Sequence, residues 1–265
     1  MAHILYIPHG AGPLPLLGDA AHEKLVRFLK KIAGRLGRPD TILIVSAHWE
    51  EIKPMVTTGK QPGLIYDYSG FSKEAYAIDY PAPGNPELAE RILAAIKKNG
   101  KTAWRHSQRG FDHGVYIPLK IMYPDASIPC VQLSLMSSLD PADHLQLGRT
   151  LTHLRQENLL VLGSGFSFHN LRAFMSGPSP DADSRNQRFQ LWLTDTCTAP
   201  MPENERTRRL LDWESADFAR YCHPREEHLL PLHVCYGMAQ CAAERVFEED
   251  VMGKKACAFL WDQGS

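Results

Sequence analysis

The chain has 265 residues, of which 29 are lysine or arginine and 30 are aspartate or glutamate, so its formal net charge is -1. This balance gives no electrostatic support for binding nucleic acid or an anionic membrane, and we expect neither partner. Hydrophobic residues make up 44% of the chain and charged residues 22%, which excludes wholesale disorder and is ordinary for a soluble globular protein.

Two features of the sequence bear on its compartment. No apolar run approaches the ~20 residues of a membrane helix, and residues 1–8 lack the positively charged start of a secretory signal. The six cysteines are sparse and contain no Cys-x-x-Cys pair, so we expect free thiols in a reducing environment. We therefore predict a cytoplasmic protein.

In the first half of the chain, short apolar runs alternate with helical patterns. Residues 4–7 predict a buried strand, and an amphipathic helix follows over 25–36. Residues 41–45 are rich in β-branched side chains, as expected of a strand buried on both faces. Asn85 and Pro86 are typical of a helix start, and the helix that they begin is expected to end at residues 99–100.

The second half continues this alternation. We expect a helical stretch over 116–123, strands over 128–135 and 159–162, and a helix that begins at residues 140–141. Residues 176–224 are less regular and predict a covering segment with one or two helices. A last helix from 225 to about 243 and a strand over 256–261 follow. This order predicts an α/β fold, in which residues 1–265 form a single layered domain with a central, largely parallel or mixed sheet flanked by helices.

Three of the 12 histidines lie near the ends of predicted strands. His9 follows the first strand, His48 follows the strand over 41–45, and His169 lies shortly after the strand over 159–162. Because the carboxyl ends of parallel strands meet at one edge of a sheet, these imidazoles are expected to converge at the usual ligand site of such folds.

Two more histidines have suggestive neighbours. His113 lies in a turn-like segment between Gly110 and Gly114, and His228 lies near the start of the last predicted helix. Five histidines suffice for a three-ligand metal centre with acid/base groups, whereas the ordinary alternative for each is a hydrogen-bonded structural residue. The remaining histidines considered have no supporting context and are expected at the surface or as caps: His3, His22, His106, His144, His153 and His223.

Eight short segments, each weak alone, run in order along nearly the whole chain: Pro8-His9-Gly10, Val45-Ser46-Ala47-His48-Trp49, Tyr66-Asp67-Tyr68-Ser69-Gly70-Phe71, Tyr80-Pro81-Ala82-Pro83-Gly84, Gly110-Phe111-Asp112-His113-Gly114, Val131-Gln132-Leu133-Ser134, Gly163-Ser164-Gly165 with His169-Asn170-Leu171, and Glu227-His228-Leu229-Leu230-Pro231-Leu232. As an ordered set they resemble the class III extradiol ring-cleavage dioxygenases, the LigB-like family. Within that family, the sequence is most similar to the DOPA 4,5-dioxygenase-like branch.

The resemblance implies a metal bound by His9, His48 and His228, with Fe(II) as the usual active ion and Zn(II) as an ion that can take its place. It also implies that His169 is the catalytic acid/base and that His113 lies beside the substrate. Many relatives use two histidines and one carboxylate, so Glu227 stays open as a ligand. The loop over 10–13 is longer than in better-known members, which leaves the substrate open.

The implied activity is that of a non-haem metal-dependent dioxygenase, which opens the ring of a catechol-type substrate by extradiol cleavage with O₂. Three protein ligands leave positions open on the metal, and zinc lacks redox chemistry. Imidazoles suit both iron and zinc. An imidazole such as His169 can take a catechol proton and return it, and His113 can hydrogen-bond the substrate.

Further side chains have two interpretations each. Asp112 could orient a histidine through its second ring nitrogen or cap a turn. Trp49, Tyr68 and Phe71 could line the pocket for the aromatic ring or pack in the core.

Two other functions stay open from the residues. A three-histidine zinc centre could activate water as a hydrolase does, and a non-catalytic relative could bind a metal alone. The glycine-rich segments 10–13 and 163–165 match neither a nucleotide-binding motif nor a nucleophile elbow. The sequence identifies neither the catechol, the regiochemistry of cleavage nor the native metal, and it leaves a homo-oligomer open.

Overall fold

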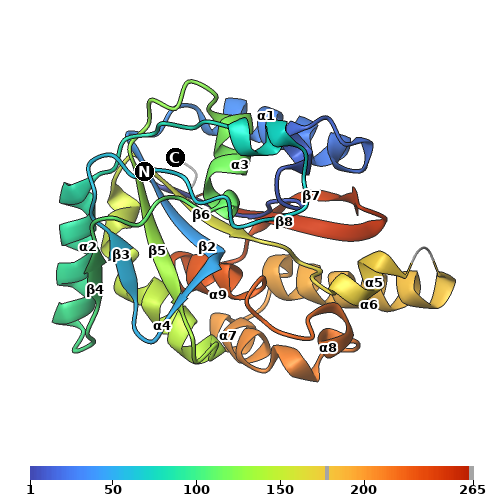
Figure 1. Cartoon of the computed structure of the whole chain (residues 1–265). Coiled ribbons are helices and arrows are strands. Elements are labelled where there is room, and N and C mark those ends of the chain that lie inside the picture. Colours follow the sequence, from blue (N-terminus) through green and yellow to red (C-terminus); the bar gives the residue numbers. More distant parts are fainter. Residues whose placement is uncertain (177–178, 263–265) are drawn as a thin grey trace.

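The computed structural model describes residues 1–176 and 179–262, and Figure 1 shows their sheet between two layers of helices. The eight strands lie in the order β4-β3-β5-β2-β6-β1-β8-β7. Their bounds are β1 His3–Pro8, β2 Thr41–Glu51, β3 Met55–Thr57, β4 Trp104–His106, β5 Cys130–Met136, β6 Leu159–Gly165, β7 Glu244–Val251 and β8 Lys254–Asp262.

The central strands β5, β2, β6 and β1 are parallel to one another. At one edge β8 and β7 are antiparallel additions, and at the other β3 is antiparallel to β5 and parallel to β4. The expectation of an α/β fold with a largely parallel or mixed sheet is therefore confirmed. That the whole span 1–265 forms one domain stays a prediction, because it includes residues outside the described ranges.

Helices cover both faces of the sheet (Figure 1). On one face lie α1 and α3, and on the other α4 and α9, which pack closely against each other. The α-helices are α1 Glu23–Leu36, α2 Pro86–Lys98, α3 His113–Met122, α4 Pro141–Thr150, α5 Leu171–Met175, α6 Pro180–Thr198, α7 Glu203–Leu211, α8 Ala219–Cys222 and α9 Leu230–Ala239. Short 3-10 turns cover Leu14–Leu16, Ala20–His22, Lys73–Ala77, Thr152–Gln156 and Trp213–Ser215.

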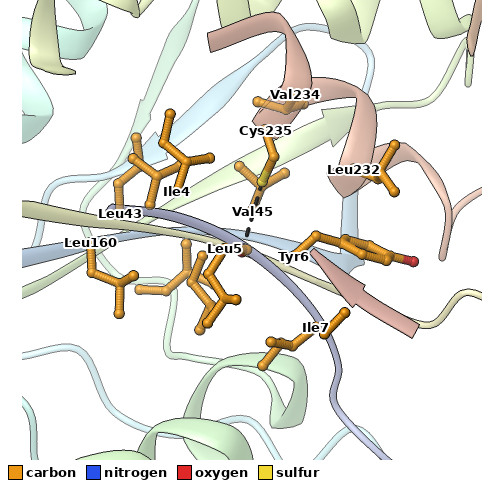
Figure 2. Packing of buried hydrophobic residues seen from close by; sticks show 14 of the residues in the cluster. Ile4, Leu5, Tyr6, Ile7, Leu43, Val45, Leu160, Leu232, Val234 and Cys235 are labelled. Carbon is orange, nitrogen blue, oxygen red and sulfur yellow. Dashed lines mark hydrogen bonds between the residues drawn. The ribbon is translucent and has the colours of Figure 1, made fainter. Parts of the chain in front are cut away.

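The core lies between the sheet and these helices. Figure 2 shows β1 side chains such as Ile4 and Tyr6 packed among residues of β2, β6 and α9. Ile4, Leu43 and Leu160 are completely buried, as expected of strands covered on both faces. Helix α2 starts as its sequence predicts, because the Asn85 side chain accepts a hydrogen bond from the amide of Leu88 at 3.0 Å.

The structure corrects the expectation for the last helix. Residues 225–243 do not form one helix: α9 begins at Leu230, with Pro231 in its first turn, and it ends where Gln240 takes a left-handed conformation. Residues 244–251 form β7, which the sequence did not predict. Charged, exposed side chains of this edge strand, such as Glu249, hide its strand pattern.

Two other expectations also change. The strand expected over 41–45 continues to Glu51. The covering segment over 176–224 holds α6, α7 and α8 rather than one or two helices, and its residues 177–178 lie outside the described ranges. None of the helices in the described part of the chain is long and apolar enough to cross a membrane.

The carboxyl ends of three parallel strands lie at the same level of the sheet. Pro8 of β1 is paired with Gly165 of β6, and Ser46 of β2 is paired with Ser164. This register brings the segments that follow β1 and β6 beside the irregular second half of β2. The register of these strands therefore places the histidines that follow them near one another.

Candidate metal centre

His9 is buried directly after β1, and its backbone amide donates to the carbonyl of Gly165 at 3.0 Å. Its Nδ1 lies 3.0 Å from the hydroxyl oxygen of Ser164. That hydroxyl donates to the carbonyl of Gly114, so its oxygen accepts a hydrogen bond from His9. His9 therefore carries its hydrogen on Nδ1 and presents an unprotonated Nε2.

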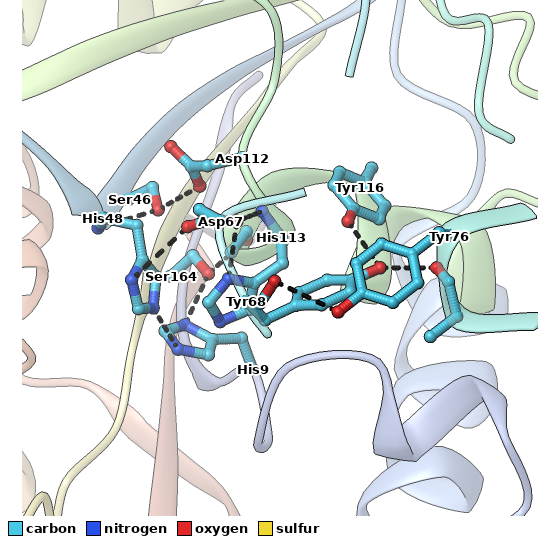
Figure 3. Close-up of polar contacts among 12 residues, drawn as sticks. His9, Ser46, His48, Asp67, Tyr68, Tyr76, Asp112, His113, Tyr116 and Ser164 are labelled. Atoms are coloured by element: carbon cyan, nitrogen blue, oxygen red, sulfur yellow. Dashed lines mark hydrogen bonds and ion pairs between the residues drawn. The ribbon is translucent and has the colours of Figure 1, made fainter. Parts of the chain in front are cut away.

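His48 lies on the irregular part of β2. There β2 advances from Val45 to Glu50 while β5 advances only from Leu133 to Leu135, so the extra residues bend the strand. The bend directs His48 Nε2 to 3.0 Å from His9 Nε2, and His48 Nδ1 faces a carboxylate oxygen of Asp67 at 3.7 Å. Figure 3 shows the two rings pointing toward each other.

This pair of rings fits a bound cation. Burial, followed by the neighbouring His48, holds the pKa of His9 well below its usual value. Burial and then His113 lower the pKa of His48 to about 3. Both imidazoles are thus neutral at neutral pH, and their Nε2 atoms lie close enough together to bind the same ion. Neutral imidazole nitrogens are the ligands that zinc and iron take.

His228 approaches the same point from the segment before α9. Its ring centroid lies 5.2 Å from that of His9 and 5.0 Å from that of His48. Its Nδ1 lies 2.8 Å from a carboxylate oxygen of Glu227, which leaves Nε2 available. Burial, followed by the neighbouring His169, holds the pKa of His228 well below its usual value.

The backbone of His228 is held against β6 and β1. Its carbonyl accepts hydrogen bonds from the Tyr6 hydroxyl at 2.9 Å and from the Phe166 amide at 3.0 Å. Gly165 permits this approach, because a Cβ at that position would collide with the same carbonyl oxygen. The end of β6 therefore places His228.

His113 is the first residue of α3 rather than part of a turn before a helix. Its Nδ1 lies 2.9 Å from Asp67 Oδ1, and its backbone amide donates to the same oxygen at 3.0 Å (Figure 3). Its ring centroid is 3.9 Å from that of His48. Potential ligand atoms of His9, His48 and His113 lie within 4.8 Å of one another.

His169 stacks on His228, with ring centroids 3.4 Å apart and ring planes 17° from parallel. Its Nδ1 lies 3.0 Å from the Glu227 oxygen that also contacts His228. These three residues form a second group of potential ligands. Burial raises the pKa of Glu227, but the hydrogen bond from His169, a backbone hydrogen bond and the neighbouring His169 and Arg225 together outweigh it, so the pKa is lowered overall and this carboxylate is ionised.

All five histidines singled out from the sequence open into one cavity of about 730 Å³. The proposed ligands are distributed over the two groups, with His9 and His48 in one and His228 in the other. Of the two interpretations left open for each, Tyr68 and Phe71 take the first and line the cavity. Trp49 is instead buried against Arg109, whose guanidinium carbon lies 4.4 Å from its ring centroid.

Comparison with known protein families agrees with this geometry. The model of a family described as the catalytic LigB subunit of aromatic ring-opening dioxygenase matches residues 4–259. The chain belongs to this family. Several of its relatives are named as extradiol dioxygenases, and enzymes of the LigB family are metal-dependent, in agreement with the histidine cluster described above.

Individual members of the LigB family are similar over most of their length. The chain is 39% identical to a 4,5-DOPA dioxygenase extradiol of Escherichia coli, covering 86% of this chain and 82% of the relative. It is 36% identical to dioxygenase tasH of Hapsidospora irregularis, over 98% and 86% of the two chains. The crystal structure of uncharacterized protein JW3007 from Escherichia coli superposes with a TM-score of 0.78 at 30% identity, over 98% and 99% of the chains.

The sequence did not predict which aspartate, Asp67 or Asp112, contacts the histidines of this LigB-family site. The histidine-orienting role, one of the two interpretations given for Asp112, falls to Asp67, while Asp112 accepts from the Ser46 hydroxyl at 2.7 Å and pairs with Arg109 at 3.2 Å. Asp67 lies in a long loop whose position no periodicity predicts. Its only signal was membership of the Tyr66–Phe71 motif.

Three histidines expected at the surface or as caps are buried: His22, His144 and His223. Their rings satisfy backbone groups inside the protein. The Ala11 amide donates to His22 at 3.1 Å, and the Met136 amide donates to His144 at 3.0 Å.

Proposed function

We propose that the chain is a non-haem metal-dependent dioxygenase that opens the ring of a catechol-type substrate by extradiol cleavage with O₂. One observation carries the proposal: five histidines line one cavity, and the Nε2 atoms of His9 and His48 lie 3.0 Å apart. Membership of the ring-opening dioxygenase family supports it.

His9, His48 and His228 are the proposed metal ligands. Nδ1 of His9 contacts Ser164 and Nδ1 of His228 contacts Glu227, which favours the tautomer in which Nε2 binds the ion. Nδ1 of His48 lies 3.7 Å from Asp67. Glu227 is a poorer candidate ligand, because one of its oxygens already faces two imidazoles. Fe(II) bound here would supply a path for electron density from catecholate to dioxygen.

His169 is the proposed acid/base. Its Nδ1 donates to Glu227, so its Nε2 is free to take a proton from a catechol hydroxyl and to return it to the opened product. His113, held by Asp67, is the proposed hydrogen-bond partner of the substrate. Overall, one ring C–C bond beside the diol and the O–O bond break, and both oxygen atoms enter the product, so no further reductant is needed.

The direct test is anaerobic loading with Fe(II), followed by admission of air in the presence of catechol. We expect the yellow absorption of a ring-opened semialdehyde from the Fe(II) protein and none from the Zn(II) protein, which binds the catechol only. Hydrolysis of esters or amides by the Zn(II) protein, without ring opening by the Fe(II) protein, would instead establish a zinc hydrolase.

The His169→Ala variant tests the acid/base role. Its Fe(II) content and its affinity for catechol should stay near those of the parent, while turnover falls by about 10²–10⁴-fold, the range expected for a lost acid/base. Metal content is measured by elemental analysis, and affinity by anaerobic titration. Turnover near the parent level would remove His169 from this role.

A further inference from the structure

We infer that the substrate is a catechol whose ring substituent is apolar and uncharged, bound along the outer part of the cavity. This inference rests on the proposed function and extends it to the class of substrate.

The cavity is much larger than a diphenol requires. Its volume is about 730 Å³, whereas a dry cavity of roughly 150 Å³ in another protein accepts benzene. A catechol whose two oxygens lie against the histidines therefore fills only the base of the cavity. The remaining space is suited to a substituent of considerable size.

The walls above the histidines are apolar. They are formed by side chains of four separate segments of the chain, namely Phe71, Phe166, Leu171, Phe174, Met175 and Met252. The hydroxyl of Tyr68, which also lines the cavity, is already engaged, because it donates to the carbonyl of Ala75 at 2.7 Å. The substituent thus meets hydrocarbon and aromatic surface with few polar partners.

The charges around the cavity disfavour an ionic substituent. Within the described part of the chain, no lysine or arginine lines it, so a carboxylate would lose water without gaining a cation. Asp67 is the lining carboxylate, but its two oxygens already face His113 and His48. An ammonium group would therefore have to compete with the imidazoles that Asp67 holds.

A neighbouring hollow of about 480 Å³ offers the alternative for an acidic substituent. It shares His169 and Leu171 with the main cavity and is lined by Arg172 and Arg225. However, Arg225 is neutralised by both oxygens of Glu50, at 2.6 and 2.5 Å. Arg172 is exposed, so water screens its attraction for an anion.

The mouth of the cavity supports the same inference. Leu171 and Met175 of α5 line it, yet they are 62% and 79% exposed. Large apolar side chains grouped at the rim of a pocket are typical of a ligand-binding surface. An apolar substituent that extends to the rim would cover both of them.

The test compares two catechols of the same shape that differ in charge. These are 4-(3-methylbutyl)catechol and 3-(3,4-dihydroxyphenyl)propionate, titrated anaerobically by calorimetry into the Zn(II)-loaded protein, which does not consume them. We expect the alkyl compound to bind at least about tenfold more tightly, because the acid must give up water for an apolar wall. In a series from 4-methyl- to 4-butylcatechol, the affinity should rise about fourfold for each methylene group.

Leu171→Ser and Met175→Ser test the rim without disturbing the core, because both side chains are mostly exposed. Each should reduce the preference for the alkyl compound about threefold or more. Leu191→Ser on α6 is the matched control: this leucine is 54% exposed and lies outside the cavity, so the preference should stay at the parent value.

Either of two results would overturn the inference about the substituent. The first is that the propionate binds as tightly as the alkylcatechol or more tightly. If the Arg172→Ala variant then lost this binding, the substituent would lie in the neighbouring hollow. The second is that affinity stays constant from 4-methyl- to 4-butylcatechol. In both cases ring opening of catechols by the Fe(II) protein still upholds the proposed function, whereas a protein that neither binds nor opens any of these catechols contradicts both.

Discussion

Two carboxylates organise the histidines at the scale of single residues. Asp67 faces His113 and His48, and Glu227 faces His169 and His228. Each carboxylate thus connects a proposed metal ligand with a proposed catalytic histidine. An anion beside Nδ1 keeps the hydrogen on that atom and raises the basicity of Nε2.

Replacing Glu227 with Gln tests this arrangement. The amide retains the shape but not the charge that holds His228 and His169, so the affinity for metal should fall about 10–100-fold, as is usual when a partner of a ligand is altered. Competition with a chelator measures it. Glu226→Gln is the control, because Glu226 pairs with Arg220 away from the histidines. Parent-like affinity in Glu227→Gln would show that this carboxylate does not support the ligand.

The five histidines could be identified from the sequence because each lies in a short motif near the end of a predicted element. Asp67 and Glu227 could not be assigned their roles in the same way. Asp67 contacts His113 across 46 positions of the chain, and Glu227 contacts His169 from the segment that precedes α9. Such pairs depend on how loops pack, which neither periodicity nor local spacing encodes.

At the scale of elements, the end of β6 decides where His228 lies. Gly165 is paired with Pro8 in the sheet, and the carbonyl of His228 packs directly on it. The site therefore depends on a glycine that has no reactive group of its own.

The Gly165→Ala variant should displace the segment that carries His228. Its added methyl group meets backbone rather than a flexible side chain, so we expect the free energy of unfolding to fall by about 1–3 kcal/mol. The affinity for metal should fall at least about tenfold. Urea unfolding and chelator competition measure the two effects.

Gly34→Ala is the control for this glycine, because the space around Gly34 in α1 is open. It should be neutral or stabilise the protein by up to about 1 kcal/mol, with unchanged affinity for metal. If Gly165→Ala bound metal like the parent, the placement of His228 by β6 would be wrong.

The elements differ in how well their sequence predicts them. β1, α1 and α2 were predicted because their patterns are undisturbed, and α2 also carries the Asn85-Pro86 start signal. The second half of β2 was missed, since Ser46 to Glu51 is polar and irregular in register. β7 was missed because the side chains of an edge strand that face water have no need of apolar alternation.

At the scale of the whole molecule, buried neutral histidines make the fold sensitive to acid. His233 of α9 is an example outside the proposed metal site: it is completely buried, and its Nε2 lies 2.8 Å from the carbonyl of Leu210. Burial lowers its pKa to about 4, although the hydrogen bond opposes this effect. The unfolded chain binds a proton near the usual value of about 6.5, well before the folded chain does.

The contribution of His233 to stability is therefore complete above about pH 6.5 and is lost as the pH falls toward 4. It amounts to about 3 kcal/mol over that interval. In His233→Gln, whose amide can still donate to Leu210, the free energy of unfolding of the metal-free protein should depend less steeply on pH, by up to about 1.4 kcal/mol per unit. Urea titrations between pH 7 and 4 measure the slope, with Leu191→Ser as a control that changes no titrating group. An unchanged slope in His233→Gln would contradict a neutral, buried His233.

The most direct test of the proposed activity follows the oxygen atoms. The Fe(II)-loaded protein is supplied with an alkylcatechol and ¹⁸O₂, and the ring-opened product is analysed by mass spectrometry under conditions that suppress exchange with water. We expect one molecule of O₂ consumed per product and both labelled atoms in that product. Ring opening with oxygen taken from water, or no consumption of O₂ with any catechol tested, would contradict the proposed dioxygenase.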